Sequence, residues 1–180
     1  MFARPLRDEP LALDLLNTQW IENGALQDAL LTLEGTREWL IECQLWNDDM
    51  PLAPARQQLL QVRQAIRAFL QGDTTTHRET LNAQLRAGHW QAQFDLDGPS
   101  LQLIVSADQR PAYLAVYNLF ELRRDAPQRI KQCAASDCIL YFFDTSPKNA
   151  RRWHDMKTCG NRVKAARHYR RRHPAAHKDD

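Results

Sequence analysis

Three cysteines and one histidine in the last third of the chain are the residues best suited to chemistry. Cys133 and Cys138 form a C-x4-C pair, and after fifteen further residues His154 and Cys159 form an H-x4-C pair. Tetrahedral Zn²⁺ binds thiolate and imidazole groups that are supplied in two close pairs. The spacing therefore predicts one zinc ion held by Cys133, Cys138, His154 and Cys159.

A zinc ion with these four ligands would have no coordination position left for water, so we expect it to be structural. It would contribute on the order of 10 kcal/mol to the folding of a small unit. Two alternatives remain open: the cysteines are packing residues beside a surface histidine, or they form disulfides in an oxidising compartment. The chain shows no phosphate-binding glycine loop and no paired nucleophile and base, so we do not expect an enzyme.

The elements around this site can be predicted from turn and cap residues. Cys133 and Cys138 would flank a tight knuckle, followed by a strand over residues 139–143. Residues 144–147 resemble a helix entry, because Thr145 or Ser146 could cap a helix with Pro147 in its first turn. His154 and Cys159 would flank a turn before the last helix, where Gly160 relieves crowding beside the metal.

Basic residues dominate that last helix. Arginine and lysine there could pair with phosphates or guanine edges, which suits a DNA groove. Val163, Ala166 and Tyr169 have the spacing to hold the opposite side against the finger. RNA binding and a merely solvated charged face are the alternatives. The candidate nucleic-acid contacts are Arg151, Arg152, Arg162, Lys164, Arg167, Arg170 and Arg171.

The charge of the chain is divided unevenly. Residues 127–180 contain thirteen Lys/Arg and five Asp/Glu, whereas residues 1–126 contain eleven and seventeen, although the whole chain has a net charge of only +2. A basic tail on an acidic body suggests a polyanionic partner for the tail, or association between the two oppositely charged parts.

The first 126 residues predict a mainly helical domain with one small antiparallel β-hairpin. Apolar stripes predict helices over residues 35–46, 54–70, 76–86 and 111–124. Alternation predicts strands over residues 90–96 and 101–105, joined by a turn at 97–99. The run over residues 11–18 fits a buried strand or the start of a helix. The fold class is therefore α+β, with domains at 1–126 and 127–180 separated near Pro127.

The composition is typical of a soluble globular protein, with 43% hydrophobic and 26% charged residues. No apolar run is long enough to cross a bilayer. Acids and proline stand where a signal peptide would have its apolar segment, so we expect a cytoplasmic protein without membrane partners. The fourth cysteine, Cys43, lies on a predicted amphipathic helix and is expected to be a small buried hydrophobe.

Several short motifs in the C-terminal third resemble those of a known family. Cys133-x4-Cys138, the run Tyr-Phe-Phe-Asp-Thr-Ser at 141–146, Arg-Arg-Trp at 151–153 and Cys-Gly-Asn-Arg at 159–162 are together similar to the CGNR zinc finger. The match covers roughly fifty residues in the correct order. The family usually has a cysteine after the tryptophan, where this chain has His154. The resemblance implies one structural zinc ion with three cysteines and one histidine.

The N-terminal part resembles the ABATE domain, which accompanies this finger in bacterial stress-induced transcription regulators. The resemblance is carried by the run Leu-Ala-Leu-Asp-Leu-Leu-Asn-Thr at 11–18. It implies a body that senses a signal, through an unidentified small effector, or that forms a homodimer. Asp14, Asn17 and Thr18 could face such a ligand, or they could be buried caps that satisfy local backbone groups.

Together these features predict a zinc-binding, DNA-binding transcription regulator with a sensing or dimerising N-terminal domain. The alternative is a zinc-stabilised protein-interaction module that does not bind nucleic acid.

Overall fold

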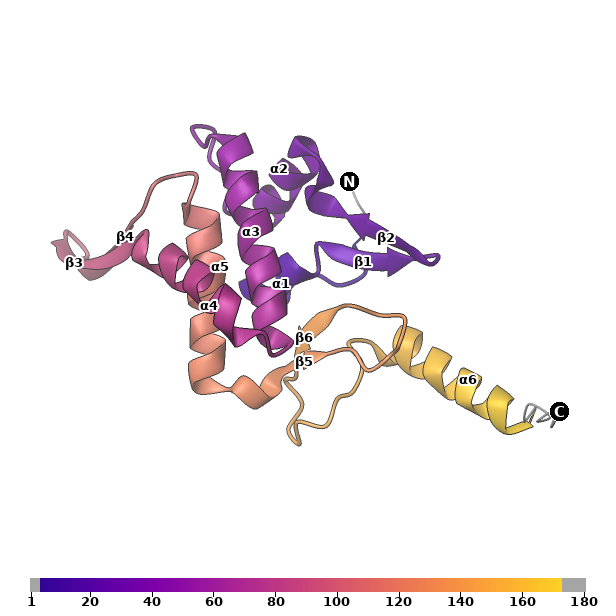
Figure 1. The fold of residues 1–180 in the computed structure, drawn as a ribbon. Coiled ribbons are helices and arrows are strands. Elements are labelled where there is room, and N and C mark those ends of the chain that lie inside the picture. Colours follow the sequence, from indigo (N-terminus) through magenta and orange to yellow (C-terminus); the bar gives the residue numbers. More distant parts are fainter. Residues whose placement is uncertain (1–3, 173–180) are drawn as a thin grey trace.

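The computed structural model describes residues 4–172, with the backbone alone at Thr74, Arg167, Arg170 and Arg171. The fold is α+β, as predicted, with a helical body and a smaller C-terminal unit below it in Figure 1. The helices of the body are α1 (Leu11–Leu16), α2 (Leu33–Glu42), α3 (Leu52–Leu70), α4 (Thr74–Arg86) and α5 (Arg110–Asp125), and a 3₁₀ turn, η1, covers Ala29–Leu31.

The core of the body is built around α1 and α3. Residues 11–18, for which strand and helix were both open, form the short helix α1 ending at Leu16. Leu13 and Leu15 are completely buried, because every residue of this helix after Leu11 is buried in the body. Helix α3 turns Leu59, Val62 and Ile66 into the same core. The predicted helix at 54–70 is therefore confirmed, although it begins two residues earlier.

Helix α2 differs from the prediction at its end. Thr32 caps its start by accepting a hydrogen bond from the Gly35 N–H at 3.0 Å. The helix ends at Glu42 rather than at residue 46, because Gln44 adopts a left-handed conformation with φ of 58°. A left-handed residue cannot continue a right-handed helix.

The body contains two β-hairpins, where the sequence predicted one. Strands β1 (Gln19–Glu22) and β2 (Ala25–Asp28) pair antiparallel and were missed. Their turn is Asn23-Gly24, and both residues have positive φ, 52° and 79°. Asn-Gly between two apolar segments is a strong signal for a two-residue hairpin, so this hairpin was recoverable from the sequence.

The one hairpin that the sequence predicted is confirmed as β3 (His89–Asp95) and β4 (Gly98–Ile104). The register pairs Asp95 with Gly98, so the turn consists of residues 96 and 97 rather than 97–99. Gly98 takes a φ of 121°, which a side chain would disfavour. This two-stranded ribbon extends away from the helices of the body, at the opposite end of the molecule from residues 161–172 (Figure 1).

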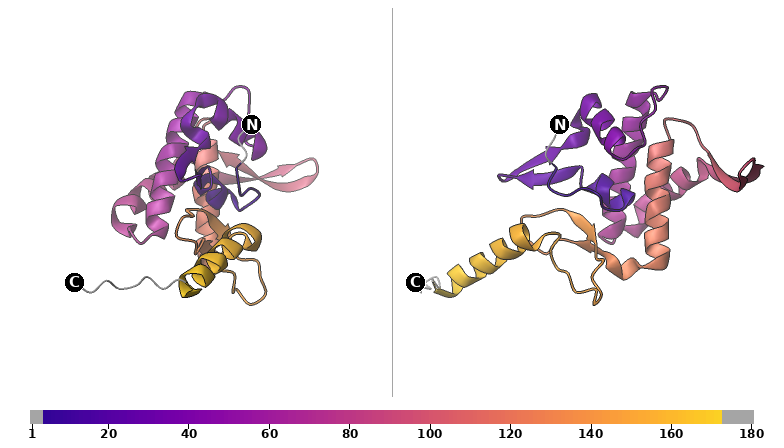
Figure 2. Two further views of the ribbon diagram at one scale, coloured as in Figure 1. Left: turned by 90° about the vertical axis from the view of Figure 1, so that its right-hand side faces the viewer. Right: turned by 180° about the vertical axis from the view of Figure 1, so that it is seen from behind.

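The C-terminal unit packs against the body through its small sheet. Strands β5 (Ile130–Gln132) and β6 (Tyr141–Phe143) pair antiparallel after a 3₁₀ turn, η2 (Pro127–Arg129). Tyr141 joins the core of the body, and the Phe143 N–H donates to a carboxylate oxygen of Glu9 at 2.8 Å. A π-helical turn, η3 (Met156–Gly160), leads into α6 (Asn161–Arg172), which extends away from the rest of the molecule (Figure 2).

Among residues 4–172, no helix combines the length and apolarity needed to cross a bilayer.

Candidate metal centre

The first ligand pair lies on a knuckle between β5 and β6. The Cys133 N–H donates to Leu140 O at 2.9 Å, which keeps the two strand ends together. The Cys138 N–H donates to Ala135 O at 3.0 Å and closes a tight turn. The knuckle predicted from C-x4-C is therefore present, and it brings both thiols to one side of the chain.

The second pair is positioned by the segment after the tryptophan. The Ala134 N–H donates to Arg152 O at 2.8 Å, so the segment before His154 lies against the knuckle. Asp155 begins the turn η3, and its carboxylate accepts from the Lys157 N–H at 2.8 Å. Cys159 lies at the end of this turn, directly before α6.

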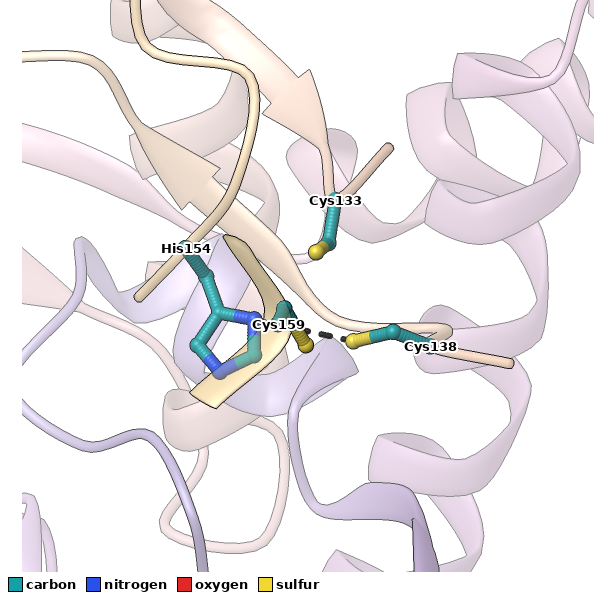
Figure 3. Close-up of side chains that lie close together, drawn as sticks. All are labelled: Cys133, Cys138, His154 and Cys159. Carbon is teal, nitrogen blue, oxygen red and sulfur yellow. Dashed lines mark hydrogen bonds between the residues drawn. The ribbon is translucent and has the colours of Figure 1, made fainter. Parts of the chain in front are cut away.

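Figure 3 shows the four side chains pointing toward one another from these separate segments. All four candidate ligand atoms lie within 4.8 Å of one another, and Cys138 Sγ is 3.6 Å from His154 Nδ1. Tetrahedral Zn²⁺ with Zn–S bonds of about 2.3 Å separates its ligand atoms by roughly 3.8 Å. The residues therefore fit the ion, and Cys133, Cys138, His154 and Cys159 form a potential zinc-binding site.

The surroundings of the site favour a cation there. Cys133, His154 and Cys159 are buried. Burial and the neighbouring thiols raise the pKa values of Cys138 and Cys159, so these thiols need a positive charge to become thiolates. Burial lowers the pKa of His154, which keeps its imidazole in the neutral form that binds metal.

Arg162 compensates part of the negative charge that three thiolates would leave on the zinc centre. Its guanidinium donates to Cys159 Sγ at 3.3 Å and to Asp137 at 2.9 Å. Hydrogen bonds to ligating sulfur disperse its charge and hold it in place. One of the candidate nucleic-acid residues therefore belongs to the support of the metal site.

Asp144 organises the loop between the two ligand pairs, a role that the sequence analysis did not predict. Its side chain is fully buried and accepts from Lys131 Nζ at 2.6 Å and from the N–H groups of Ser146 and Arg151, each at 2.9 Å. Burial opposes ionisation, but these donors hold the pKa of Asp144 well below its usual range. The predicted helix entry at 144–147 is wrong: no helix begins there, and Asp144 instead holds residues 144–151 as a loop through these hydrogen bonds.

The other basic candidates occupy different positions. Arg151 is turned inward: its guanidinium lies 4.8 Å from the centre of the Phe142 ring and donates to His154 O. Arg152 is exposed and lies over the Trp153 ring at 5.3 Å. Lys164 is exposed on α6. The side chains of the remaining three candidates lie outside the described part of the chain, namely those of Arg167, Arg170 and Arg171.

The expected packing of α6 against the finger is wrong beyond its first turn. Val163 is partly buried beside the ligands, but Ala166 is exposed and Tyr169 is 65% exposed. The helix is held at its N-terminal end by η3 and leaves the protein from there (Figure 2).

The three N-terminal residues that could face a ligand have different surroundings in the structure. Asn17 and Thr18 are completely buried and bond within the protein, Asn17 to the backbone of Tyr141 and Thr18 to Leu15 O and Arg63. Asp14 accepts from Arg4 at 2.9 Å and from the Trp39 indole N–H at 2.8 Å. Of the three, Asp14 lines a surface pocket of about 410 Å³, together with Arg4, Arg7, Asp8, Glu9, Leu11, Glu42 and Cys43.

Comparison with known families agrees with this arrangement. Residues 129–172 match the model of the CGNR zinc finger, and residues 9–126 match the ABATE model, described as "Putative stress-induced transcription regulator". No curated protein matches the chain. Because the second model covers well over half of its length, the chain belongs to the ABATE family, and its C-terminal unit is a CGNR zinc finger.

Proposed function

We propose that this protein is a DNA-binding transcription regulator in which a structural zinc ion fixes the start of a cationic helix. The observation that supports the proposal best is the placement of α6. The helix contains six lysines and arginines and no acid, begins two residues after Cys159 and projects from the body (Figure 2). Its twelve residues span about 18 Å. The major groove of DNA, which is about 12 Å wide, accepts such a helix.

A second feature continues this surface beside the finger. A hollow of about 580 Å³ lies next to the zinc site, where Lys148, Arg152 and Trp153 contribute to its wall. Positive groups beside an apolar floor suit the phosphates and sugars of a nucleic-acid backbone. We propose that this hollow receives the strand next to the groove that α6 enters.

We propose further that the N-terminal body senses a signal or dimerises, and that the protein is a cytoplasmic non-enzyme. The pocket beside Asp14 has a volume within the range of small-molecule sites, and its lining contains both guanidinium and carboxylate groups. A polar effector would fit such a lining. Four protein ligands fill a tetrahedral zinc ion, which leaves it no position for catalysis.

The test is a salt titration of the zinc-loaded full chain with a fluorescent DNA duplex. Fluorescence anisotropy should show binding that weakens as salt rises, with log affinity falling by about 0.9 per phosphate contacted for each unit of log salt. Lys164→Gln should reduce that slope by about 1. Arg78→Gln removes the same charge from an exposed position on α4 and serves as the matched control.

No binding at about 50 mM salt would overturn the proposal and favour the protein-interaction module, because phosphate contacts are strongest at low salt. Equal losses in Lys164→Gln and Arg78→Gln would show that the charge of the chain, rather than α6, causes the binding. Tighter binding to an RNA hairpin than to duplex DNA would contradict the assignment to DNA.

A further inference from the structure

The β3–β4 ribbon has one apolar and one polar face. Side chains alternate between the two faces of a strand, and directly paired residues share a face. Three pairs place only apolar residues on the first face: Trp90 with Leu103, Ala92 with Leu101, and Phe94 with Pro99. The intervening pairs on the other face include Gln91 with Gln102 and Gln93 with Ser100. The apolar face of such an amphipathic ribbon is suited to packing against another element.

The body covers only the inner end of that face. Leu103 is 8% exposed, and the Trp90 ring lies 5.9 Å from the Tyr117 ring of α5. Toward the tip, Leu101 is 65% exposed and Phe94 is 89% exposed. The ribbon has left the helices there (Figures 1 and 2), so nothing in the described part of the chain packs against its outer half.

The apolar surface also continues along α5. Tyr117 touches Trp90 on one side and lies 6.1 Å from the Phe120 ring on the other. Phe120 is 46% exposed. Ribbon and helix together therefore present one continuous strip, which we call the ribbon strip: Trp90, Phe94, Leu96, Leu101 and Phe120.

From this strip we infer that the protein forms a homodimer in which the apolar faces of two β3–β4 ribbons pack against each other across a two-fold axis. The inference rests on the dimerising role proposed for the N-terminal body, and it is independent of DNA binding.

The exposed area of the ribbon strip fits contact with a second copy of the chain. A fully exposed aromatic side chain offers about 150–250 Å², but Trp90 and Phe120 are only 39% and 46% exposed, so the three aromatic and two leucine side chains together amount to roughly 600 Å² on each copy. That is the upper end of the apolar patches that monomeric proteins expose. Two strips would bury about 1,200 Å², which reaches the range of specific interfaces.

The shape and charge of the ribbon suit contact with itself. Phe94 is 89% exposed and forms part of the wall of a hollow of about 420 Å³, which Ala92, Pro99 and Leu101 line from the apolar face and to which Gln93 and Ser100 also contribute. A projection and a recess therefore lie next to each other on the ribbon. A two-fold interface requires such self-complementarity. Residues 89–105 contain no lysine or arginine, and their only acids, Asp95 and Asp97, are at the tip. In an antiparallel arrangement the tips of the two copies lie apart, so these acids do not repel one another.

The arrangement would leave α6 free in both copies, because the ribbon and α6 lie at opposite ends of the molecule (Figures 1 and 2).

Sedimentation equilibrium of the zinc-loaded full chain, without DNA, tests the inference. We expect a dimer of the 20.9 kDa chain whose dissociation constant rises at least about tenfold in the double variant Phe94→Thr, Leu101→Thr. Both side chains are exposed, and threonine suits a strand, so the variant should fold like the parent chain. The control is Gln91→Thr, Gln102→Thr, which changes the polar face of the same two strands and should leave the dimer intact.

If the protein sediments with the mass of a single chain at concentrations up to about 100 µM, the inference is overturned. The ribbon strip would then bind a different protein. A dimer that survives Phe94→Thr, Leu101→Thr but dissociates in high salt would also overturn it, because that behaviour indicates contact between the basic tail and the acidic body. Anisotropy with DNA, measured on the same samples, reports separately on the proposed function.

Discussion

Asn17 bonds to both backbone polar groups of Tyr141. Its amide Nδ2 donates to Tyr141 O at 2.8 Å, and its Oδ1 accepts from the Tyr141 N–H at 2.9 Å. Asn17 follows α1 and is fully buried, whereas Tyr141 begins β6 of the finger. One side chain of the body thus replaces a strand partner for the finger and fixes the finger against the body.

Replacing Asn17 with alanine should strongly destabilise the protein. The substitution leaves two buried backbone groups of Tyr141 without partners, and each unsatisfied group costs about 1–3 kcal/mol. We expect the free energy of unfolding to fall by about 3 kcal/mol in urea titrations of the zinc-loaded chain. Gln57→Ala, at an exposed position of α3, is the control and should change it little. Equal effects of the two substitutions would contradict the role assigned to Asn17.

Zinc removal should unfold the C-terminal unit. The purified chain is expected to contain close to one equivalent of zinc, and Cys159→Ser or His154→Ala should lower that content. Without metal, the twelve residues of α6 lose their anchor, and an isolated helix of that length is marginal in water. Elemental analysis measures the zinc, and the loss of helical circular dichroism on adding a chelator measures the unfolding.

Cys43→Ser is the matched control for these variants, because Cys43 is not one of the four clustered ligands. It should keep the full zinc content. Zinc retained in full by Cys159→Ser would show that the clustered side chains are not the ligands.

Cys43 itself should be an unreactive thiol. Burial, helped by the negative charge of Asp14, raises the pKa of Cys43 to about 12. Since the thiolate is the nucleophile, alkylation at pH 8 should be more than about 100-fold slower than for a free cysteine. Mass-spectrometric mapping of iodoacetamide labelling checks this, with the urea-unfolded chain as the reference. Equal labelling rates for Cys43 in the folded and unfolded chain would contradict it.

The metal site could be predicted because its information is local. Two pairs of ligands with short internal spacing specify a knuckle and a turn, whatever the remaining chain does. Asp144 could not be predicted in the same way. Its role depends on Lys131, which precedes it by thirteen residues on another strand, and a lone aspartate before Thr-Ser-Pro is equally typical of a helix start.

The helices of the body were predictable from their apolar period, but their ends and surroundings were not. The left-handed turn at Gln44 has no strong sequence signal, since glutamine rarely adopts that conformation. The exposure of α6 was also not predictable: Val163, Ala166 and Tyr169 have the spacing of a packed stripe, but Ala166 and Tyr169 are exposed and Val163 alone of the three is partly buried. Periodicity shows that a face exists, and tertiary structure decides whether anything covers it.

A last prediction concerns acid stability and the ion pair between Asp28 and Arg63. Arg63 Nη1 and Nη2 donate to the two carboxylate oxygens of Asp28 at 2.7 and 2.6 Å, which joins α3 to the end of β2. Burial alone would raise the pKa of Asp28, but the hydrogen bonds and charge of Arg63 outweigh it, so the pKa lies below its unfolded value of 3.8.

Because the folded pKa of Asp28 is the lower one, the pair stabilises the protein above the unfolded pKa, and this contribution is lost as the pH falls through the folded value. Asp28→Asn should therefore lower the free energy of unfolding at pH 7 by about 2 kcal/mol, less than the loss of about 3–5 kcal/mol for a fully buried pair, because the Asp28 side chain is 17% exposed. The deficit relative to the parent chain should shrink as the pH falls from about 4 through the folded pKa, which lies below 3.8. Urea titrations at a series of pH values measure it, with Asp49→Asn in the exposed loop after α2 as the control. Protonation of Asp28 removes its charge from the parent chain and should bring the stability of the two chains together. If the stability difference stays constant across this range, the Asp28 carboxylate is not the acid-sensitive group.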